Sequence, residues 1–343
     1  MNWSDVTRVS VIMPTWIGDV VMATPAIAHL RTLLPENACI TAMTRPKHTA
    51  LLEGIDSINS VTTIDPRGVL GPWRTGRTIA RSTPDAVLVL PGSFRSALAA
   101  RLSGCPRRIG WERDRRGWLL TEAPTPPSRT TATSTIDWYR DLVDPSASTP
   151  ACRPELAVAQ SDRQAAADVI GEHPAPFVVL VPAAIRADKR WPSGRFAAVA
   201  NSLHELRGWT TVIAGSPSDR DITSEIASQC TAPVIDLAAV GSSLGALKSI
   251  MQQAEVAICI DTGPRHVAIG VGTPTVSLFG PTDHRWTIVP DAHEVRLLAA
   301  PFLTENLVAD SMANSKRLKF QVGMKRISIA DVLNAIIEMQ NTI

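Results

Sequence analysis

Residues 9–34 read VSVIMPTWIGDVVMATPAIAHLRTLL, a short apolar run followed by a longer stretch with helical spacing. Val9–Met13 has the length and composition of a buried strand, and Val20–Leu34 has the apolar spacing of a helix that Pro35 ends. Another apolar run, Ala38–Met43, follows this helix. The order strand, helix, strand predicts a parallel sheet covered by helices.

This alternation stops and then restarts. After a strand predicted at Asp85–Leu90, the stretches 121–135 and 144–154 are rich in Pro, Ser and Thr, which is typical of loops and linkers. The alternation resumes with five apolar runs of strand length, at Phe177–Val181, Thr210–Ala214, Pro233–Leu237, Val256–Ile260 and Thr275–Phe279. The second block is by its pattern a complete doubly wound unit.

We therefore predict an α/β protein with two Rossmann-like domains, at 1–160 and 161–326. The amphipathic stretch Ile329–Met339 predicts a final helix within 327–343. Two doubly wound units in one chain predict a cleft between them, because ligands bind outside the carboxyl ends of the strands in open α/β sheets.

Composition narrows the class of protein. Of the 343 residues, 45% are hydrophobic and 19% are charged, which excludes a disordered chain. The formal net charge of +2 gives no reason to expect nucleic acid as a partner. No apolar run approaches the roughly 18 residues of a membrane span, and the first residues do not resemble a secretory signal.

The five cysteines lie at 39, 105, 152, 230 and 259, and no two of them form a C-x-x-C pair. An odd number of scattered cysteines favours neither a disulfide framework nor a structural zinc site. We therefore expect a protein of the reducing cytoplasm.

The first segment with chemical potential is Pro14–Asp19, directly after the first predicted strand. Gly18 permits a tight turn that brings the backbone close to a ligand, and Asp19 lies near a helix N-terminus at the predicted cleft. The competing interpretation is that Asp19 only caps this helix. The segment has no G-x-G-x-x-G pattern, which argues against a dinucleotide-dependent oxidoreductase.

A second segment, Asp261–His266, follows the strand Val256–Ile260 and has the order of an Asp-Thr-Gly turn that leads into a helix. A helix start offers free backbone N–H groups and a positive dipole end, so it suits an anion such as a pyrophosphate. Thr262 adds a hydroxyl donor, and His266 lies on the first turn. A capped helix with a buried, hydrogen-bonded histidine is the alternative.

A third segment, Arg186–Pro192, follows the strand Phe177–Val181 and carries three cations to the same predicted sheet edge. Lys189 there can supply a point charge for a phosphate. A solvated basic loop is the alternative interpretation.

The fourth segment is rich in arginine and tryptophan, with Arg107, Arg108, Trp111, Arg113, Arg115, Arg116 and Trp118. It lies in the more basic part of the chain, since residues 1–150 contain 17 Lys and Arg against 13 Asp and Glu. Arginine suits carboxylates and phosphates, and tryptophan suits sugar faces. A solvated charged face, with Glu112 and Asp114 as local ion-pair partners, explains the segment equally well.

Two further patterns are weaker. Asp219-Arg220-Asp221 has the spacing that some sugar transferases use for a divalent metal, but it follows Gly215-Ser216-Pro217 and fits a helix start better. No serine stands in a G-x-S-x-G setting, so a serine hydrolase is not expected.

Together these segments resemble the ADP-heptose:lipopolysaccharide heptosyltransferases, a group of GT-B glycosyltransferases. The resemblance covers about residues 8–290. It rests on six motifs in order, namely Trp16-Ile17-Gly18-Asp19, Ser93–Leu98, Arg108-Ile109-Gly110-Trp111, Lys189-Arg190-Trp191-Pro192, Asp261–His266 and Val276–Thr282. The Trp before Ile-Gly-Asp and the Ser-Phe-Arg-Ser loop are most similar to the type II enzymes, which add the second heptose.

The resemblance implies two Rossmann-like domains facing across a cleft, with the sugar nucleotide mainly on the second domain. It also implies that the helix in 327–343 crosses back to the first domain. Asp19 falls where the family has its catalytic base. The expected nucleotide-sugar site comprises Lys189, Asp219, Asp261, Thr262, Gly263 and His266, with Asp219 near the ribose and Lys189, Thr262, Gly263 and His266 at the phosphates.

For the acceptor, the resemblance and the basic segment together predict contacts from Ser93, Arg95, Arg108, Arg113, Arg115 and Arg116. Many relatives have a cysteine-rich stretch before the last helix, whereas 301–326 contains no cysteine and is polar and basic. This departure bears on the identity of the sugar or the acceptor.

The expected function is therefore an inverting glycosyltransferase that needs no metal and no cofactor. It would move a heptose from ADP-heptose to a hydroxyl of the lipid A–inner core acceptor, working in the cytoplasm at the inner membrane face. The alternatives are a GT-B transferase for another nucleotide sugar, a sugar-nucleotide epimerase and a non-catalytic sugar-nucleotide-binding module. A carboxylate at Asp19 favours a transferase over a binding module, which has no need of it.

Overall fold

The computed structural model describes residues 1–127, 133–148, 151–171, 175–280, 282–299 and 323–341. By their internal contacts these residues form two compact units. The first comprises nearly all of residues 1–157 together with Thr287–Asp291, and the second comprises Val158–Trp286 and the chain from Ala292 onward.

The first unit contains a five-stranded parallel sheet with the strand order β3-β2-β1-β4-β5. Its strands are β1 (Arg8–Ile12), β2 (Cys39–Thr44), β3 (Ser60–Thr63), β4 (Ala86–Val89) and β5 (Arg107–Ile109). Its helices are α1 (Ile17–Met22), α2 (Thr24–Leu33), α3 (Thr49–Leu52), α4 (Gly71–Arg81), α5 (Phe94–Leu102) and α6 (Thr135–Val143).

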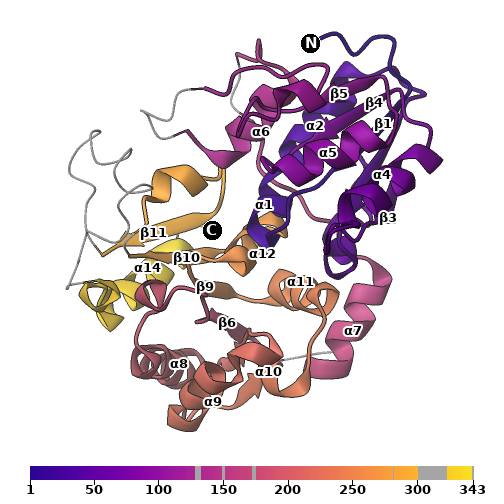
Figure 1. The fold of residues 1–343 in the computed structure, drawn as a ribbon. Coiled ribbons are helices and arrows are strands. Elements are labelled where there is room, and N and C mark those ends of the chain that lie inside the picture. The colour runs from indigo at the N-terminus through magenta and orange to yellow at the C-terminus, as the bar shows by residue number, and fades with distance from the viewer. Residues whose placement is uncertain (128–132, 149–150, 172–174, 281, 300–322, 342–343) are drawn as a thin grey trace. The chain divides into compact units, whose positions relative to one another are not determined.

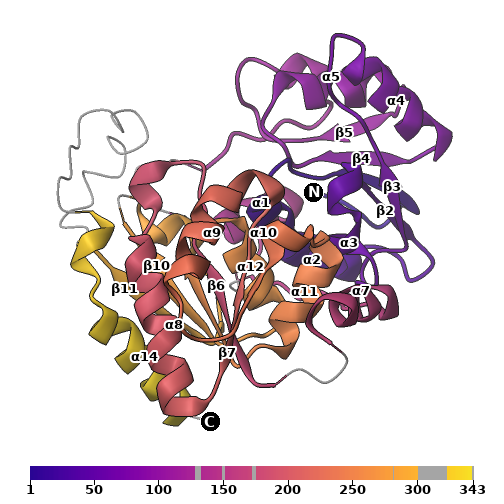
Figure 2. The same cartoon turned by 90° about the horizontal axis from the view of Figure 1, so that it is seen from below.

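Helices cover both faces of this sheet, with α4 and α5 on one face and α2 on the other (Figure 2). On the α4–α5 face, Ile79, Ala97 and Ala100 pack with Val87 and Val89 of β4 in one buried cluster. β4 is buried along its whole length because its alternating side chains meet helices on both sides.

The single helix predicted at Val20–Leu34 is in fact two helices, α1 and α2, that meet at Ala23. Pro25 lies in the first turn of α2 and has no backbone N–H to continue the hydrogen-bond ladder of α1. The Thr24 hydroxyl instead donates to the Val21 carbonyl at 2.8 Å. The break makes α1 a separate short helix that contains Asp19.

The second unit contains a six-stranded parallel sheet with the order β11-β10-β9-β6-β7-β8 (Figure 1). Its strands are β6 (Phe177–Val181), β7 (Thr210–Ile213), β8 (Val234–Asp236), β9 (Val256–Ile260), β10 (Thr275–Phe279) and β11 (Glu294–Leu298). Its helices are α7 (Gln160–Ile170), α8 (Ser193–Arg207), α9 (Arg220–Gln229), α10 (Leu237–Val240), α11 (Leu244–Gln253), α12 (Gly263–Gly270) and α14 (Ile329–Asn341).

In both sheets the order of the strands reverses at one place. The neighbours there are β1 and β4 in the first unit and β6 and β9 in the second. Ligands of open α/β sheets bind outside the carboxyl ends of the strands at such a switch point. In the second unit this places the loops that follow β6 and β9, with Lys189 and Asp261, at the expected ligand edge.

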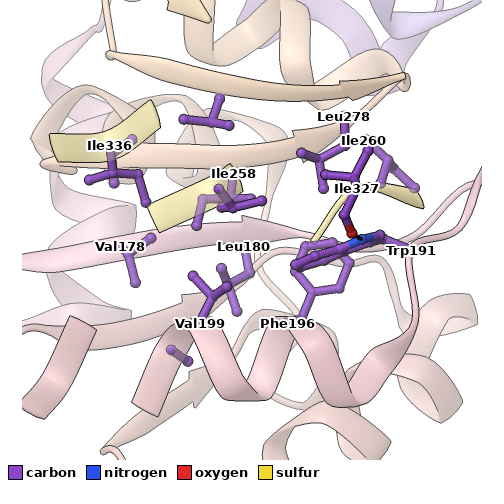
Figure 3. Close-up of a cluster of buried hydrophobic side chains, with 14 of the residues drawn as sticks. Val178, Leu180, Trp191, Phe196, Val199, Ile258, Ile260, Leu278, Ile327 and Ile336 are labelled. Atoms are coloured by element: carbon purple, nitrogen blue, oxygen red, sulfur yellow. Dashed lines mark hydrogen bonds between the residues drawn. The ribbon is translucent and has the colours of Figure 1, made fainter. Parts of the chain in front are cut away.

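A large apolar cluster on one side of the second sheet holds the loop after β6 in place (Figure 3). Trp191 ends this loop and is fully buried, and its ring meets that of Phe196 edge-on with the centroids 5.0 Å apart. The Trp191 indole N–H donates to the Ile327 carbonyl at 3.0 Å. Lys189 lies two residues earlier, so the packing of Trp191 restricts the position of its backbone.

The helix α14 packs within the second unit, and the expectation that it also crosses to the first domain stays a prediction. It contacts α8, β10 and β11, and Val332, Ile336 and Met339 belong to the same cluster as Trp191 (Figure 1 and Figure 2). Its apolar stripe is covered by the sheet of its own unit. Of the polar, basic stretch 301–326 that contains no cysteine, residues 301–322 lie outside the described residues.

Candidate functional site in two strand-end clusters

Asp19 lies in the first turn of α1, directly beyond β1. Trp16 occupies the N-cap position of this helix, and no side chain caps it. Among the described residues, the Asp19 carboxylate has no hydrogen-bond or ion-pair partner. The capping interpretation of Asp19 therefore lacks a capping bond, although a carboxylate in the first turn still interacts favourably with the helix dipole.

Burial raises the pKa of Asp19 to about 6. Tyr139 of α6 lies close enough that the charge of Asp19 adds to the burial that raises the tyrosine's own pKa. A carboxylate with a pKa near the working pH is well matched to general-base chemistry. Tyr139 could not be connected with Asp19 from the sequence, since they are 120 positions apart and Tyr139 belongs to no recognisable motif.

In the second unit, Lys189 and Asp261 meet as the strand-end argument predicts. The Lys189 Nζ lies 2.6 Å from Asp261 Oδ2 and 3.3 Å from the Asp261 carbonyl oxygen. Thr282 donates its hydroxyl hydrogen to the same Oδ2 at 2.7 Å. Burial alone would raise the pKa of Asp261, but Lys189 and Thr282 outweigh it and hold that pKa below its ordinary value.

The start of α12 supplies donors beside this ion pair. Thr262 has extended backbone geometry at the N-cap position, and its hydroxyl makes no capping bond. The first N–H groups of a helix have no acceptor within the helix, and Pro264 contributes none. The start of α12 can therefore offer a backbone N–H and the Thr262 hydroxyl as donors.

His266 is buried on the first turn of α12. Burial, with the positive charge of Arg265, lowers the pKa of His266 to about 3, so the imidazole is neutral at physiological pH. Its Nε2 lies 3.4 Å from an Arg265 guanidinium nitrogen, and its buried Nδ1 has no partner among the described residues. His266 can offer a hydrogen bond to a ligand there but not a positive charge.

Arg265 points into the second unit. It pairs with Glu294 of β11 at 2.6 Å, donates to Ser277 at 2.9 Å and lies over the Phe279 ring at 4.9 Å. This buried ion pair joins the start of α12 to β11. It was not predicted, because nothing in the sequence shows that Arg265 faces the sheet.

Asp219 belongs to a 3-10 turn at Pro217–Asp219 before α9. One carboxylate oxygen accepts from the Ser216 N–H at 2.9 Å and from the Ser216 hydroxyl at 2.5 Å. This fits the helix-start interpretation of Asp219-Arg220-Asp221. Within the described part of the chain, the other carboxylate oxygen of Asp219 has no hydrogen-bond partner.

Two of the predicted acceptor arginines donate to main-chain carbonyls of their own unit. Arg116 is fully buried, donates to the carbonyls of Trp111, Pro91 and Ser93, and has a pKa lowered by burial to about 10. Arg108 donates to the Leu119 and Cys105 carbonyls at 3.0 and 2.6 Å. Buried carbonyl groups need donors, and a guanidinium supplies several in a fixed geometry. Arg116 is therefore a correction to the predicted acceptor site, whereas Arg108 is only partly buried and its role there stays a prediction.

Ser93 and Arg95 also have structural partners. Ser93 is the N-cap of α5 and accepts from the Ser96 N–H at 3.2 Å. Arg95 donates to the carbonyls of Pro66 at 2.8 Å and of Gly68. Both side chains are nevertheless exposed, so a role at the acceptor stays a prediction.

Arg113 and Arg115 fit the prediction best. Both are exposed, and they flank Asp114 in a turn where Asp114 and Arg115 have positive φ values of 51° and 56°. Such backbone strain outside glycine often marks functional sites, and the buried Arg116 holds this turn. Arg113 lies against Gly92, since a Cβ there would come within 3.3 Å of the arginine Cδ.

Within the described residues, no three His, Cys, Asp or Glu side chains are grouped in a way that suits a metal ion. Over the same residues, every helix is too short or too polar to span a membrane.

Comparison with known proteins gives a consistent picture. The family model of glycosyltransferase family 9 (heptosyltransferase) matches residues 72–302. The chain is 27% identical to lipopolysaccharide heptosyltransferase 2 of Salmonella typhimurium over 85% of this chain and 87% of that one. It is 36% identical to lipopolysaccharide heptosyltransferase 3 of Escherichia coli over 110 residues, which are 32% of each chain.

Among solved structures, ADP-heptose lps heptosyltransferase II of E. coli superposes with a TM-score of 0.82 at 22% identity, over 97% of this chain and 98% of that one. The fold is accordingly the GT-B fold of two parallel α/β domains. Since the family model covers well over half of the sequence, the chain belongs to glycosyltransferase family 9, the heptosyltransferases.

Proposed function

We propose that this enzyme moves a heptose from ADP-heptose to a hydroxyl of a lipopolysaccharide inner core, with inversion at the anomeric carbon and without a metal. The names of the relatives support the donor and the acceptor, since they include lipopolysaccharide heptosyltransferase 2 and ADP-heptose lps heptosyltransferase II. The observation that carries the mechanism is Asp19, a partly buried carboxylate beyond β1 with a raised pKa.

In the proposed reaction, ionised Asp19 takes the proton of the acceptor hydroxyl while the hydroxyl oxygen attacks the anomeric carbon. The bond between that carbon and the diphosphate oxygen breaks on the opposite face, so configuration inverts and ADP leaves with the bonding electrons. General-base help of this kind contributes roughly 10²- to 10⁴-fold. Burying an ionised carboxylate costs free energy, and a non-catalytic binding module would gain nothing in return.

Lys189, Thr262 and the helix start at Gly263 are proposed to receive the charge that develops on the leaving ADP. Fixed donors stabilise a transition state best where charge appears. Asp261 positions Lys189, with the 2.6 Å contact as the supporting observation. Neutral His266 would donate or accept a hydrogen bond at the donor, and the free oxygen of Asp219 would meet the ribose.

The pH dependence tests Asp19 as the base. Because the base must be ionised and its pKa is about 6, kcat/KM should be level above that pH. Below it, the rate should fall about tenfold for each pH unit. A steady-state profile of kcat/KM between about pH 5 and pH 8 checks this. A level profile across that range would remove Asp19 from the role of base.

Metal independence is a separate expectation. Lys189 and the α12 start provide positive charge for the diphosphate, so turnover should be unchanged after incubation with excess EDTA. Initial rates are measured with and without the chelator at a fixed donor concentration. Loss of turnover that Mg²⁺ or Mn²⁺ restores would show that a metal carries this charge.

The acceptor site is tested by Arg113→Gln with Arg115→Gln. Both side chains are exposed on the strained turn, so their loss should leave the fold and the KM for donor nearly unchanged. The KM for acceptor should rise about tenfold, as expected for lost charged hydrogen bonds. Arg207→Gln, an exposed arginine at the end of α8, is the matched control. An equal rise of both KM values in the double variant would point to a folding role for the turn.

A further inference from the structure

The first unit exposes a group of large apolar side chains on α4, on α5 and on the loops beside them. They are Val69, Leu70, Trp73, Phe94, Leu102 and Trp118. Val69 is 92% exposed and Trp118 is 71% exposed, so neither contributes to the core. Single exposed apolar residues are ordinary on soluble proteins, but a contiguous group marks an interaction site. We call this group, with the arginines between its members, the α4–α5 surface.

Three contacts join the members into one surface. α4 packs closely on α5, since a Cβ at Gly76 would come within 3.0 Å of the Leu102 Cβ (Figure 2). Arg95 at the start of α5 donates to the carbonyl of Gly68, next to Val69. The Phe94 and Trp118 rings stand 6.2 Å apart between centroids.

The charge of α4, α5 and the residues directly before them has one sign. Residues 66–81 and 93–102 contain no Asp or Glu and carry six arginines, namely Arg67, Arg74, Arg77, Arg81, Arg95 and Arg101. The neighbouring acid, Asp65, pairs with Arg67 at 3.0 Å and with Arg74 at 3.5 Å. Arg77 lies over the Trp73 ring at 4.8 Å. An excess of positive charge therefore surrounds the exposed apolar side chains.

We propose that the α4–α5 surface docks on an anionic lipid membrane. Tryptophan and arginine combine an apolar body with a polar tip, which suits the boundary between head groups and acyl chains. Val69 and Leu70 are exposed aliphatic tips directly before α4, which can enter the acyl region while the arginines meet lipid phosphates. Such aliphatic tips are of no use against nucleic acid, which binds through phosphates and stacked bases. The proposal does not depend on the proposed acceptor.

The test is co-sedimentation of the full chain with vesicles of phosphatidylethanolamine and phosphatidylglycerol, compared with vesicles of phosphatidylcholine. The wild type should bind the anionic vesicles at least tenfold better. This preference should fade when salt is raised from about 0.1 M to about 1 M, since screening then acts over about 3 Å instead of about 10 Å. Absence of binding to anionic vesicles, or equal binding to both kinds, would overturn the proposal.

Substitutions test whether the α4–α5 surface is the part of the protein that binds vesicles. Val69→Ser, Leu70→Ser and Trp73→Ser together should reduce vesicle binding at least tenfold, and the exposed positions should leave the melting temperature unchanged. Arg77→Glu with Arg81→Glu should abolish the preference for anionic lipid. The matched control is Leu206→Ser with Val240→Ser, two apolar residues of the second unit that are 67% and 59% exposed. Equal binding by the triple variant and this control would refute the location.

Kinetics separate membrane docking from acceptor recognition. With a deacylated, water-soluble core acceptor, the triple variant should keep the wild-type kcat/KM, whereas with the acceptor embedded in anionic vesicles it should lose most of it. Equal loss with both acceptors would assign the surface to acceptor binding and overturn the proposal. If the wild type transfers no heptose to either acceptor, the proposed function fails while the vesicle experiment still decides the docking surface.

Discussion

Asp19→Asn is expected to lower the turnover number by roughly 10²-fold or more while the affinity for ADP stays close to wild type. Asparagine keeps the size of the side chain, and no hydrogen bond among the described residues depends on the carboxylate. The change removes only the ability to accept a proton. Turnover is measured in a steady-state transfer assay and ADP affinity by titration calorimetry.

Glu36→Gln, which neutralises an exposed carboxylate in the same unit, is the control for a general effect of charge. It should retain wild-type turnover. Full activity of Asp19→Asn would mean that another group accepts the proton, and loss of ADP binding together with activity would mean that the substitution disturbs the fold.

The same substitution should change stability in a pH-dependent way. The folded protein favours the protonated form of Asp19, because its pKa is raised to about 6. The stabilisation associated with that neutral form is present at low pH and is lost as the pH rises through about 6. Asp19→Asn should therefore melt at a higher temperature than wild type at about pH 8 and at a similar temperature at about pH 4. A lower melting temperature of the variant at the higher pH would show that the ionised carboxylate stabilises the fold.

The second large effect is expected for Lys189→Ala, which should weaken ADP binding by about 10- to 100-fold, the range for a lost hydrogen bond to a charged group. The loss has two parts. The ammonium group that would meet the diphosphate is gone, and the Asp261 carboxylate, which the lysine contacts at 2.6 Å, is left beside the anion.

The double variant Lys189→Ala with Asp261→Asn separates these parts. Removing the uncompensated carboxylate should restore some of the lost affinity but not all of it. Lys325→Ala, an exposed lysine of the same unit, is the control and should bind ADP normally. If calorimetry shows that Lys189→Ala binds ADP with wild-type affinity, the diphosphate assignment is refuted. If the double variant binds ADP no more tightly than Lys189→Ala, the repulsion by Asp261 is refuted.

Strands of the second unit that are buried on both faces could be predicted with their bounds, whereas the partly exposed β11 was missed. Buried strands appear in the sequence as uninterrupted apolar runs, and Phe177–Val181, Val256–Ile260 and Thr275–Phe279 have the predicted bounds. Helices with weaker patterns were missed. The helix α5 buries mainly alanines, and α6 begins inside a polar stretch where Ser134 caps it. The cost of ordering these segments is offset by packing that no local pattern reveals.

For the candidate site, sequence reasoning located the strand-end loops but not the partners of individual charges. The convergence of Lys189 and Asp261 follows from parallel strands alone, since neighbouring carboxyl ends share one edge. Whether an arginine faces solvent or main-chain carbonyls depends on where the chain folds back. Arg116 and Arg113 belong to one basic segment, yet one is fully buried and the other exposed. The orientation of Arg265 toward Glu294 could not be predicted from the sequence for the same reason.

The proposed transfer itself can be measured directly. Wild-type enzyme is incubated with ADP-heptose and an inner-core acceptor in excess EDTA, and the acceptor is analysed by mass spectrometry and by NMR of the new anomeric centre. We expect the acceptor to gain one heptose for each ADP released, with the anomeric configuration opposite to that of the donor. Retained configuration, release of ADP without a gain in acceptor mass, or transfer only from a different nucleotide sugar would contradict the proposed reaction.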